Sequence, residues 1–206
     1  MNITCGILDY SVGNLGSVSR ALEKAGAETS LINRPQDVMG VDVLVLPGVG
    51  AFGAAMASLR ERDCGEAVVE RARADKPIVG ICLGMHLLFE SSDEAEGVAG
   101  LGILPGHVRR LSFGPRIGWE PISPVQAPGH ESDAFGIASG GAFFFCHNYH
   151  VPSLTTSHAL MACHGPERSV AVLEKANIVG LQFHPERSQI AGLRLLAQLL
   201  HRWTDL

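Results

Sequence analysis

The sequence predicts an α/β fold in which a mixed, mainly parallel sheet is flanked by helices. Over the first half, short apolar runs alternate with segments of helical periodicity, which is typical of a parallel sheet covered on both faces. Over the second half, strand-like segments follow one another with turn residues between them, so we expect several of them to pair antiparallel. Because no linker divides the chain, we expect residues 1–206 to form a single domain.

In the first half, apolar runs predict buried strands and periodic segments predict helices. Val18, Leu22 and Ala25 recur at helical spacing, and Gly26 is a typical helix stop. The run "VDVLVLPGVG" predicts a strong strand that ends at Pro47 and Gly48. We therefore expect strands at 3–10, 29–33, 41–46 and 77–81, and helices at 16–26, 53–75 and 83–92.

In the second half, strands dominate until a closing helix. The segments that read as strands are 102–111, 115–125, 140–151, 157–165 and 169–185. A helix over 191–203 follows, and its apolar face is expected to hold Leu193, Leu196, Leu199 and Leu200.

Composition excludes several classes of protein. The net charge of −5 provides no basic patch for nucleic acid, and no apolar run approaches the roughly 18 residues of a membrane span. The N-terminus lacks the basic region of a signal peptide, so we expect a cytoplasmic protein. Five cysteines without a CxxC pair argue against a disulfide framework and a cysteine zinc site. We expect no metal and no cofactor.

Three segments follow predicted strands and are candidates for a site. In open α/β sheets, ligands bind outside the carboxyl ends of the strands. The segments are "LPGVGAF" at 46–52, "GICLG" at 80–84 and "QFHPE" at 182–186. We expect the sheet to bring them together although they are far apart in the sequence.

Cys82 lies between Gly80 and Gly84, directly after a strand and before a helix. This Gly-x-nucleophile-x-Gly pattern is typical of a nucleophile elbow, a strained turn that projects its central side chain. The helix N-terminus favours a thiolate, and the amide of Leu83 can donate to an oxyanion. The alternative is a small buried cysteine packed at a strand–helix junction.

His184 is the candidate base for this cysteine. It ends a strand, and Glu186 stands two residues later, where an extended chain places both side chains on the same side. A carboxylate that orients a histidine beside a cysteine is the general arrangement for a thiol nucleophile. The turn at Gly48 and Gly50 can supply a second oxyanion amide or be a plain turn, and the missing GK[ST] excludes a Walker phosphate site.

With these residues assembled, the sequence resembles the class I (triad) glutamine amidotransferases. More narrowly, it is similar to the glutaminase subunits of imidazole glycerol phosphate synthases. The triad motifs "PGVGAF", "GICLGM" and "QFHPE" stand in family order. The narrower likeness rests on "DYSVGNLGSVSRALEKAG", "IGWEP", "FCHNYHV" and "HPERSQIAGLRLL". The resemblance covers essentially the whole chain and implies a flavodoxin-like fold.

The resemblance also implies a reaction. Cys82 attacks the carboxamide of glutamine, His184 acts as general base and then as general acid, and Glu186 orients His184. Water hydrolyses the resulting γ-glutamyl thioester and releases glutamate. Ammonia passes to a (β/α)8-barrel cyclase subunit, which forms imidazole glycerol phosphate and an aminoimidazole carboxamide nucleotide. The implied oxyanion and substrate-binding residues are Val49, Gly50, Leu83, His86, His147, Asn148 and Tyr149, and the implied partner-interface residues are Asn14, Trp119 and Arg187.

The chain departs from the family pattern near substrate and partner. His86 replaces a glutamine that helps to hold the substrate, so it either substitutes for that amide in part or weakens glutamine binding. The other departures are Arg116 for His, Glu120 for Asn, Asn148 for Ser and Arg187 for Lys. Alternatives to the synthase subunit are therefore a paralogous glutaminase that feeds another synthase, a non-catalytic partner of a barrel enzyme, and a free-standing thiol hydrolase.

Overall fold

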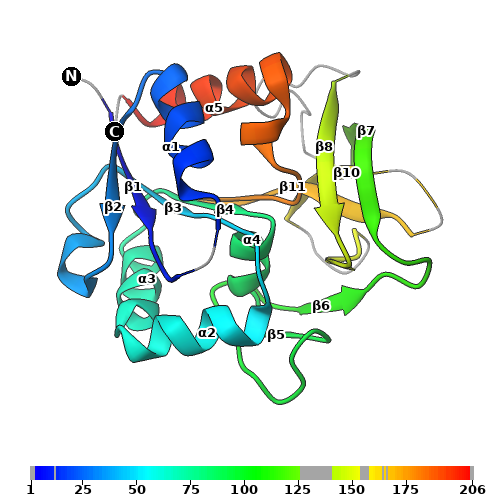
Figure 1. Ribbon diagram of the computed structural model, residues 1–206, viewed down its shortest axis with the longest axis horizontal. Helices are drawn as coiled ribbons and strands as arrows, with labels where there is room; N and C mark the ends of the chain where they lie inside the picture. Colours follow the sequence, from blue (N-terminus) through cyan, green and yellow to red (C-terminus); the bar gives the residue numbers. More distant parts are fainter. Residues whose placement is uncertain are drawn as a thin grey trace.

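In the computed structural model, which describes residues 3–11, 13–125, 141–153, 158–163, 165 and 167–204, the strands form one large sheet. Within these residues the sheet has nine strands in the order β2-β1-β3-β4-β12-β11-β10-β7-β8 (Figure 1). The observed sheet is mixed, which confirms the predicted fold class.

The first five strands of this order are parallel to one another. Four of them are short, mostly apolar and buried, because the centre of a parallel sheet is covered on both faces, whereas β2 is an edge strand with mostly polar, exposed residues. The bounds of the five strands are β1 Thr4–Leu8, β2 Glu28–Ile32, β3 Val43–Leu46, β4 Ile78–Ile81 and β12 Ile178–Leu181.

The remaining four strands extend the sheet antiparallel, as the second half of the sequence predicts. They are β11 Ser169–Lys175, β10 Ala159–Cys163, β7 Arg116–Pro124 and β8 Ala142–His147. A small sheet of β5 Ser91–Ser92, β6 His107–Arg110 and β9 Tyr149–His150 lies beside them.

Helices cover both faces of the parallel strands. α1 Leu15–Lys24 and α5 Gln189–Trp203 lie on one face, and α2 Phe52–Glu61, α3 Cys64–Arg73 and α4 Leu83–Leu87 lie on the other (Figure 1). Two apolar clusters fill the two layers between helices and sheet. Leu195, Leu196, Leu199 and Leu200 are the buried leucines of α5, and Leu193 packs against the core only partly buried. Of the described helices, none combines the length and apolar character that crossing a membrane requires.

Several predicted elements are shorter or divided: the strand expected over 102–111 is reduced to β6, and the one expected over 140–151 is divided into β8 and β9. The helix expected over 53–75 is broken at Asp63, whose backbone is left-handed with φ of 55°, so α2 and α3 are separate. The helix expected over 83–92 ends at Leu87, and the chain then turns into β5. The strand expected over 169–185 is a hairpin of β11 and β12, because Ala176 turns the chain with φ of 51°. The described residues also include two short 3₁₀ turns, Pro35–Asp37 and Pro185–Arg187.

The sheet order brings the three candidate segments together. β4 pairs with β3 on one side and β12 on the other, with Leu46 opposite Gly80 and Leu181 opposite Ile81. All three strands are parallel, so their carboxyl ends open onto one edge of the sheet. The segments at 46–52, 80–84 and 182–186 therefore meet there, as the sequence predicts.

Candidate active site

Cys82 occupies a strained backbone position at the end of β4. Its φ of 49° and ψ of −106° lie outside the regions that a residue with a Cβ adopts readily. The amide of Cys82 donates to the carbonyl of Leu181 at 2.6 Å, and its carbonyl accepts from the amide of His86 at 3.1 Å. These two bonds hold the turn from both sides. The side chain is 6% exposed and lines a cavity.

Gly48 brings the glycine-rich turn into direct contact with this elbow. A Cβ added at Gly48 would stand 1.9 Å from the carbonyl oxygen of Ile81 and 2.5 Å from the amide nitrogen of Leu83. Only a glycine permits that approach. Leu83 is the first residue of α4, so its amide has no acceptor within the helix. The turn at 47–50 thus lies beside an amide that is available to a ligand.

The buried hydroxyl of Tyr10 donates to the carbonyl of Pro47, at the start of the same turn. Burial raises the pKa of Tyr10, and the nearby charge of Cys82 raises it further. Tyr10 therefore stays a neutral donor at any physiological pH, and its hydrogen bond fixes the position of Pro47 at the start of the turn.

His184 and Glu186 form a hydrogen-bonded pair beside Cys82. The Nδ1 atom of His184 lies 2.8 Å from Oε1 of Glu186, and both side chains are almost fully buried. The segment is fastened to β8, because the amide of His184 donates to the carbonyl of Phe144 and the amide of Phe144 donates to Oγ of Ser188. The sequence predicts this pairing from an extended chain. The structure produces it in a short 3₁₀ turn over Pro185–Arg187.

The environment of His184 favours its protonated form. Burial by itself would lower the pKa of His184, but hydrogen bonds to Cys82 and Glu186, together with their negative charges, raise it to about 10. His184 is therefore an imidazolium at neutral pH. A positive charge in this position stabilises negative charge on the Cys82 sulfur.

The three segments enclose a cavity of about 200 Å³. All seven predicted oxyanion and substrate-binding residues line it, together with Cys82, His184 and Arg187. Gly48, Glu94 and Cys146 line it too. Sequence reasoning did not select Glu94, which stands in the acidic run "SSDEAEG" after α4. Burial raises the pKa of Glu94, and a backbone bond from Phe52 lowers it.

His147 is one of the residues that line this cavity. Its Nδ1 atom donates to the carbonyl of Tyr149 at 2.8 Å, so its Nε2 atom carries a lone pair. Among the described residues, that buried Nε2 has no hydrogen-bond partner. Burial, and then the nearby His86, lower the pKa of His147 to about 3, so the ring stays neutral.

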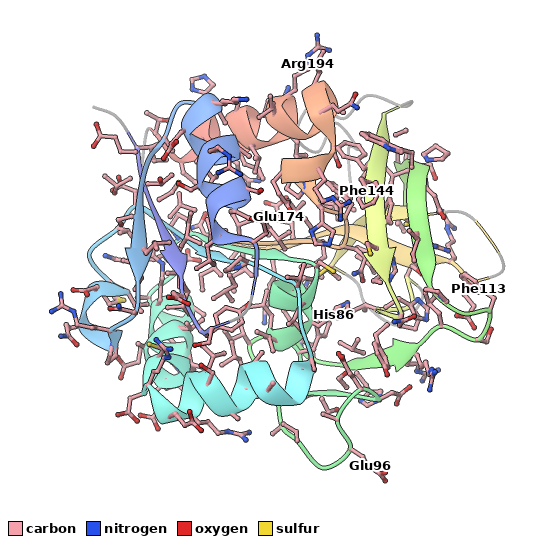
Figure 2. All side chains as sticks on the ribbon, in the orientation of Figure 1. His86, Glu96, Phe113, Phe144, Glu174 and Arg194 are labelled. Atoms are coloured by element: carbon pink, nitrogen blue, oxygen red, sulfur yellow. The ribbon has the colours of Figure 1, made fainter. Side chains whose placement is uncertain are left out.

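His86 lies on α4, one turn past the elbow, and it is labelled near the centre of Figure 2. Its Nε2 atom is 2.9 Å from Oε1 of Gln182, a fully buried residue between β12 and His184. The amide nitrogen of Gln182 points to the Cys82 sulfur at 3.9 Å. Gln182 was not selected from the sequence, because only the fold brings it next to His86.

Two predicted interface residues lie together on the outside of the site. Trp119 on β7 is 47% exposed and meets the ring of Phe144 on β8 edge to face, at 6.1 Å between centroids. The guanidinium of Arg187 lies over the same Phe144 ring, 4.0 Å from its centroid. Figure 2 labels Phe144 on β8, beside the chain that leads into α5. Arg187 thus connects the cavity wall to the pair of half-buried Phe144 and exposed Trp119.

The third predicted interface residue, Asn14, caps α1. Its side-chain oxygen accepts from the amide of Ser17 at 3.3 Å. Two of the departures from the family pattern are partners of each other, since Nε of buried Arg116 lies 3.5 Å from Oε2 of Glu120. Within the described part of the chain, no cluster of three or more His, Cys, Asp or Glu side chains is arranged to hold a metal ion.

Comparisons with a family model and with curated proteins agree on one family. A family model described as glutamine amidotransferase class-I matches residues 7–202. A protein of Symbiobacterium thermophilum called imidazole glycerol phosphate synthase subunit HisH is 43% identical over 194 residues, which cover 93% of this chain and 90% of the relative. A protein of the same name from Gloeobacter violaceus is 38% identical over 204 residues, which cover 95% and 88%.

Solved structures share the fold. A structure described as a glutamine amidotransferase aligns with a TM-score of 0.76 at 18% identity, over 98% of this chain and 99% of the other. The structure of PurLQS from Thermotoga maritima aligns with a TM-score of 0.76 at 19% identity, also over 98% and 99%. At these identities the solved structures bear on the fold alone.

Proposed function

This chain belongs to the class I glutamine amidotransferase family, and from that premise we propose that it is the glutaminase subunit of an imidazole glycerol phosphate synthase. The observation that carries the proposal is the convergence of Cys82, His184 and Glu186 on one cavity at the carboxyl ends of adjacent strands. The proposal takes residues 1–206 as one domain. It also takes the location as cytoplasmic, because a catalytic thiol stays reduced there.

The reaction begins at the Cys82 sulfur. The thiolate attacks the carboxamide carbon of glutamine, and the carbonyl oxygen becomes an oxyanion held by the amides of Leu83 and Val49. The imidazolium of His184 then gives its proton to the departing nitrogen, and ammonia leaves a γ-glutamyl thioester on Cys82. Neutral His184 takes a proton from water, the hydroxide attacks the thioester, and glutamate departs. Glu186 orients the ring throughout and stabilises its cation.

The cavity suits the charge distribution of glutamine. Its wall carries a carboxylate, Glu94, and a guanidinium, Arg187, which complement the ammonium and carboxylate groups of a free amino acid. These assignments extend the predicted substrate-binding set by two residues, Glu94 and Arg187, the second of which the sequence assigned to the partner interface.

The partner in this proposal is a (β/α)8-barrel cyclase subunit that receives the ammonia in a heterodimer. The exposed face of β7 supports such an interface, since Ile117 is 64% exposed and Trp119 is 47% exposed. Exposed aromatic and arginine side chains are enriched in protein interfaces. Arg187 contacts both this face and the cavity, so the surface that meets the partner is continuous with the site. For Asn14, the interface role stays a prediction.

The test is a glutaminase assay with and without the cyclase subunit from the same source. Wild type should release glutamate and should be stimulated by the cyclase, whereas Cys82→Ala should show no activity above background. Cys64→Ala is the matched control, because Cys64 is a buried cysteine at the start of α3 that does not line the cavity. Activity that survives in Cys82→Ala would end the mechanism.

A paralogous glutaminase that serves another synthase is the second candidate. It is favoured by the Arg116–Glu120 pair, which replaces two family residues on the strand that carries Trp119. Failure of the cognate cyclase to stimulate an otherwise active wild type would support this candidate. A non-catalytic partner requires neither the strained Cys82 nor the His184–Glu186 pair, so an active wild type would exclude it.

A further inference from the structure

The buried amide of Gln182 lies between His86 and the Cys82 sulfur. We propose that His86 is a positioning residue that acts on Cys82 through Gln182, by holding the amide so that its NH2 group faces the sulfur. This inference rests on Cys82 being the nucleophile of the proposed function. It assigns roles to two side chains, Gln182 and His86, that lie behind the reacting atom.

The geometry decides which way the amide points. The Nε2 atom of His86 faces an oxygen, Oε1 of Gln182, at 2.9 Å. Because an oxygen can only accept, the proton of the imidazole must sit on Nε2. The imidazole of His86 and the amide of Gln182 are both buried, so water cannot replace the hydrogen bond between them. A Gln182 that rotated by half a turn could keep the bond only if the imidazole proton of His86 moved to Nδ1, for which the described residues provide no acceptor.

The same orientation presents a donor to the nucleophile. With Oε1 on His86, the amide nitrogen lies 3.9 Å from the Cys82 sulfur, within the range for hydrogen bonds to sulfur. A donor in this position stabilises negative charge on the sulfur when it reacts. The opposite orientation would place a carbonyl oxygen against the sulfur and repel its negative charge. His86 therefore selects the amide orientation that assists the nucleophile.

His86 performs this role only while it is neutral in the correct tautomer. Burial lowers the pKa of His86 to about 4, the bond to Gln182 raises it and nearby His150 lowers it. The other ionisable groups that act on this cluster are His147 beside His86, and His184 and Tyr10 beside Cys82. Among these groups, His86 alone contacts Gln182.

The family's glutamine at this position also carries an amide NH2 group. A His86→Gln variant can therefore donate to Oε1 of Gln182 and keep the orientation. A His86→Leu variant has similar bulk but no donor, so it removes the orienting bond. This pair of variants separates a positioning role from simple packing.

The experiment measures alkylation of Cys82 by iodoacetamide, and mass spectrometry follows each site separately because the exposed Cys146 also reacts. At pH 7 we expect His86→Leu to slow alkylation of Cys82 about 5-fold. His86→Gln should stay within about 2-fold of wild type. His150→Leu is the control, since His150 is a buried, hydrogen-bonded histidine bound to Ser169 instead.

Gln182→Leu provides an independent test if His86→Leu folds poorly. Gln182→Leu should slow alkylation to the same extent, and the double variant should be no slower than either single one. Equal rates in wild type, His86→Leu and Gln182→Leu would overturn the proposal, and so would effects that multiply in the double variant. In glutamine hydrolysis, His86→Leu should lower kcat more than it raises KM, whereas a substrate-holding His86 would change KM. Because alkylation needs no glutamine, this outcome is separate from that of the proposed function.

Discussion

At the scale of single residues, the site depends on conformations and charges that the surroundings impose. Cys82 keeps a φ of 49° because its amide and its carbonyl are both hydrogen-bonded to neighbouring segments. His184 keeps its proton because Cys82 and Glu186 outweigh the effect of burial on its pKa. Each of these features would relax in an isolated peptide, where solvent replaces the neighbours.

Glu186→Gln is expected to lower glutaminase kcat by on the order of 10²- to 10⁴-fold, since the amide keeps the size of the side chain but not its charge. The pKa of His184 should fall, because one of its two stabilising partners becomes neutral. A pH–rate profile of the complex with its cyclase measures both effects. A variant with wild-type kcat would remove Glu186 from the triad. Glu174→Gln is the control, as this partly exposed carboxylate pairs with Arg202 far from the cavity.

At the scale of elements, the turn at 47–50 is placed by what lies on either side of it. Gly48 allows contact with the elbow, and the Tyr10 hydroxyl holds the carbonyl of Pro47 from the other side. Val49 is left 46% exposed at the mouth of the cavity. A turn that is fixed at its first residue and open at its third is suited to reorient one amide without moving the strand before it.

Gly48→Ala should therefore separate the two halves of the oxyanion site. The added methyl group cannot stand 1.9 Å from the carbonyl oxygen of Ile81, so the turn must withdraw from α4. We expect glutaminase kcat to fall about 10²- to 10³-fold, the effect of losing one oxyanion donor, while iodoacetamide still modifies Cys82.

The control for this variant is Gly40→Ala. There the methyl group would stand 3.5 Å from the carbonyl oxygen of Asp37, an ordinary contact. Gly40→Ala should leave kcat unchanged. Full activity in Gly48→Ala would show that the turn does not contribute to the oxyanion site.

At the scale of the whole molecule, buried histidines tie stability to pH in two directions. Burial lowers the pKa of His86 to about 4 and that of His147 to about 3, so both stay neutral in the folded state. The unfolded chain protonates them below about pH 6.5, and stability is lost as the pH falls. His184 acts in the opposite sense. Its pKa of about 10 contributes stability below pH 6.5 that is lost as the pH rises toward 10.

The acid side of this dependence can be assigned to one residue. Between pH 7 and pH 5, wild type should lose about 2 kcal/mol more unfolding free energy than His86→Gln, because the variant no longer binds that proton on unfolding. Urea unfolding at the two pH values measures the difference. His201→Gln, which removes an exposed histidine of α5, should follow wild type. Equal losses in wild type and His86→Gln would contradict the buried, neutral state of His86.

The sequence by itself determined the features of this protein that are local. Apolar runs and segments of helical periodicity predicted the mixed sheet and its helices. A strand that is buried on both faces is a continuous apolar run, and a helix that is buried on one face has apolar residues at helical spacing. The pattern around Cys82, and the two-residue step from His184 to Glu186, are likewise local, and they predicted the site. All seven predicted substrate-binding residues line the cavity, while their roles stay predictions.

Only the tertiary structure decided the contacts between distant residues. His86 and Gln182 are 96 positions apart, and no spacing rule relates a helix residue to a strand end across the sheet. The contact of Arg187 with Phe144 likewise needs the strand pairing and the 3₁₀ turn at once. The break between α2 and α3 escaped the sequence because a left-handed Asp63 is selected by the packing of both helices. Local patterns record which face of an element is buried, but the partner across that face is chosen only when the whole chain packs.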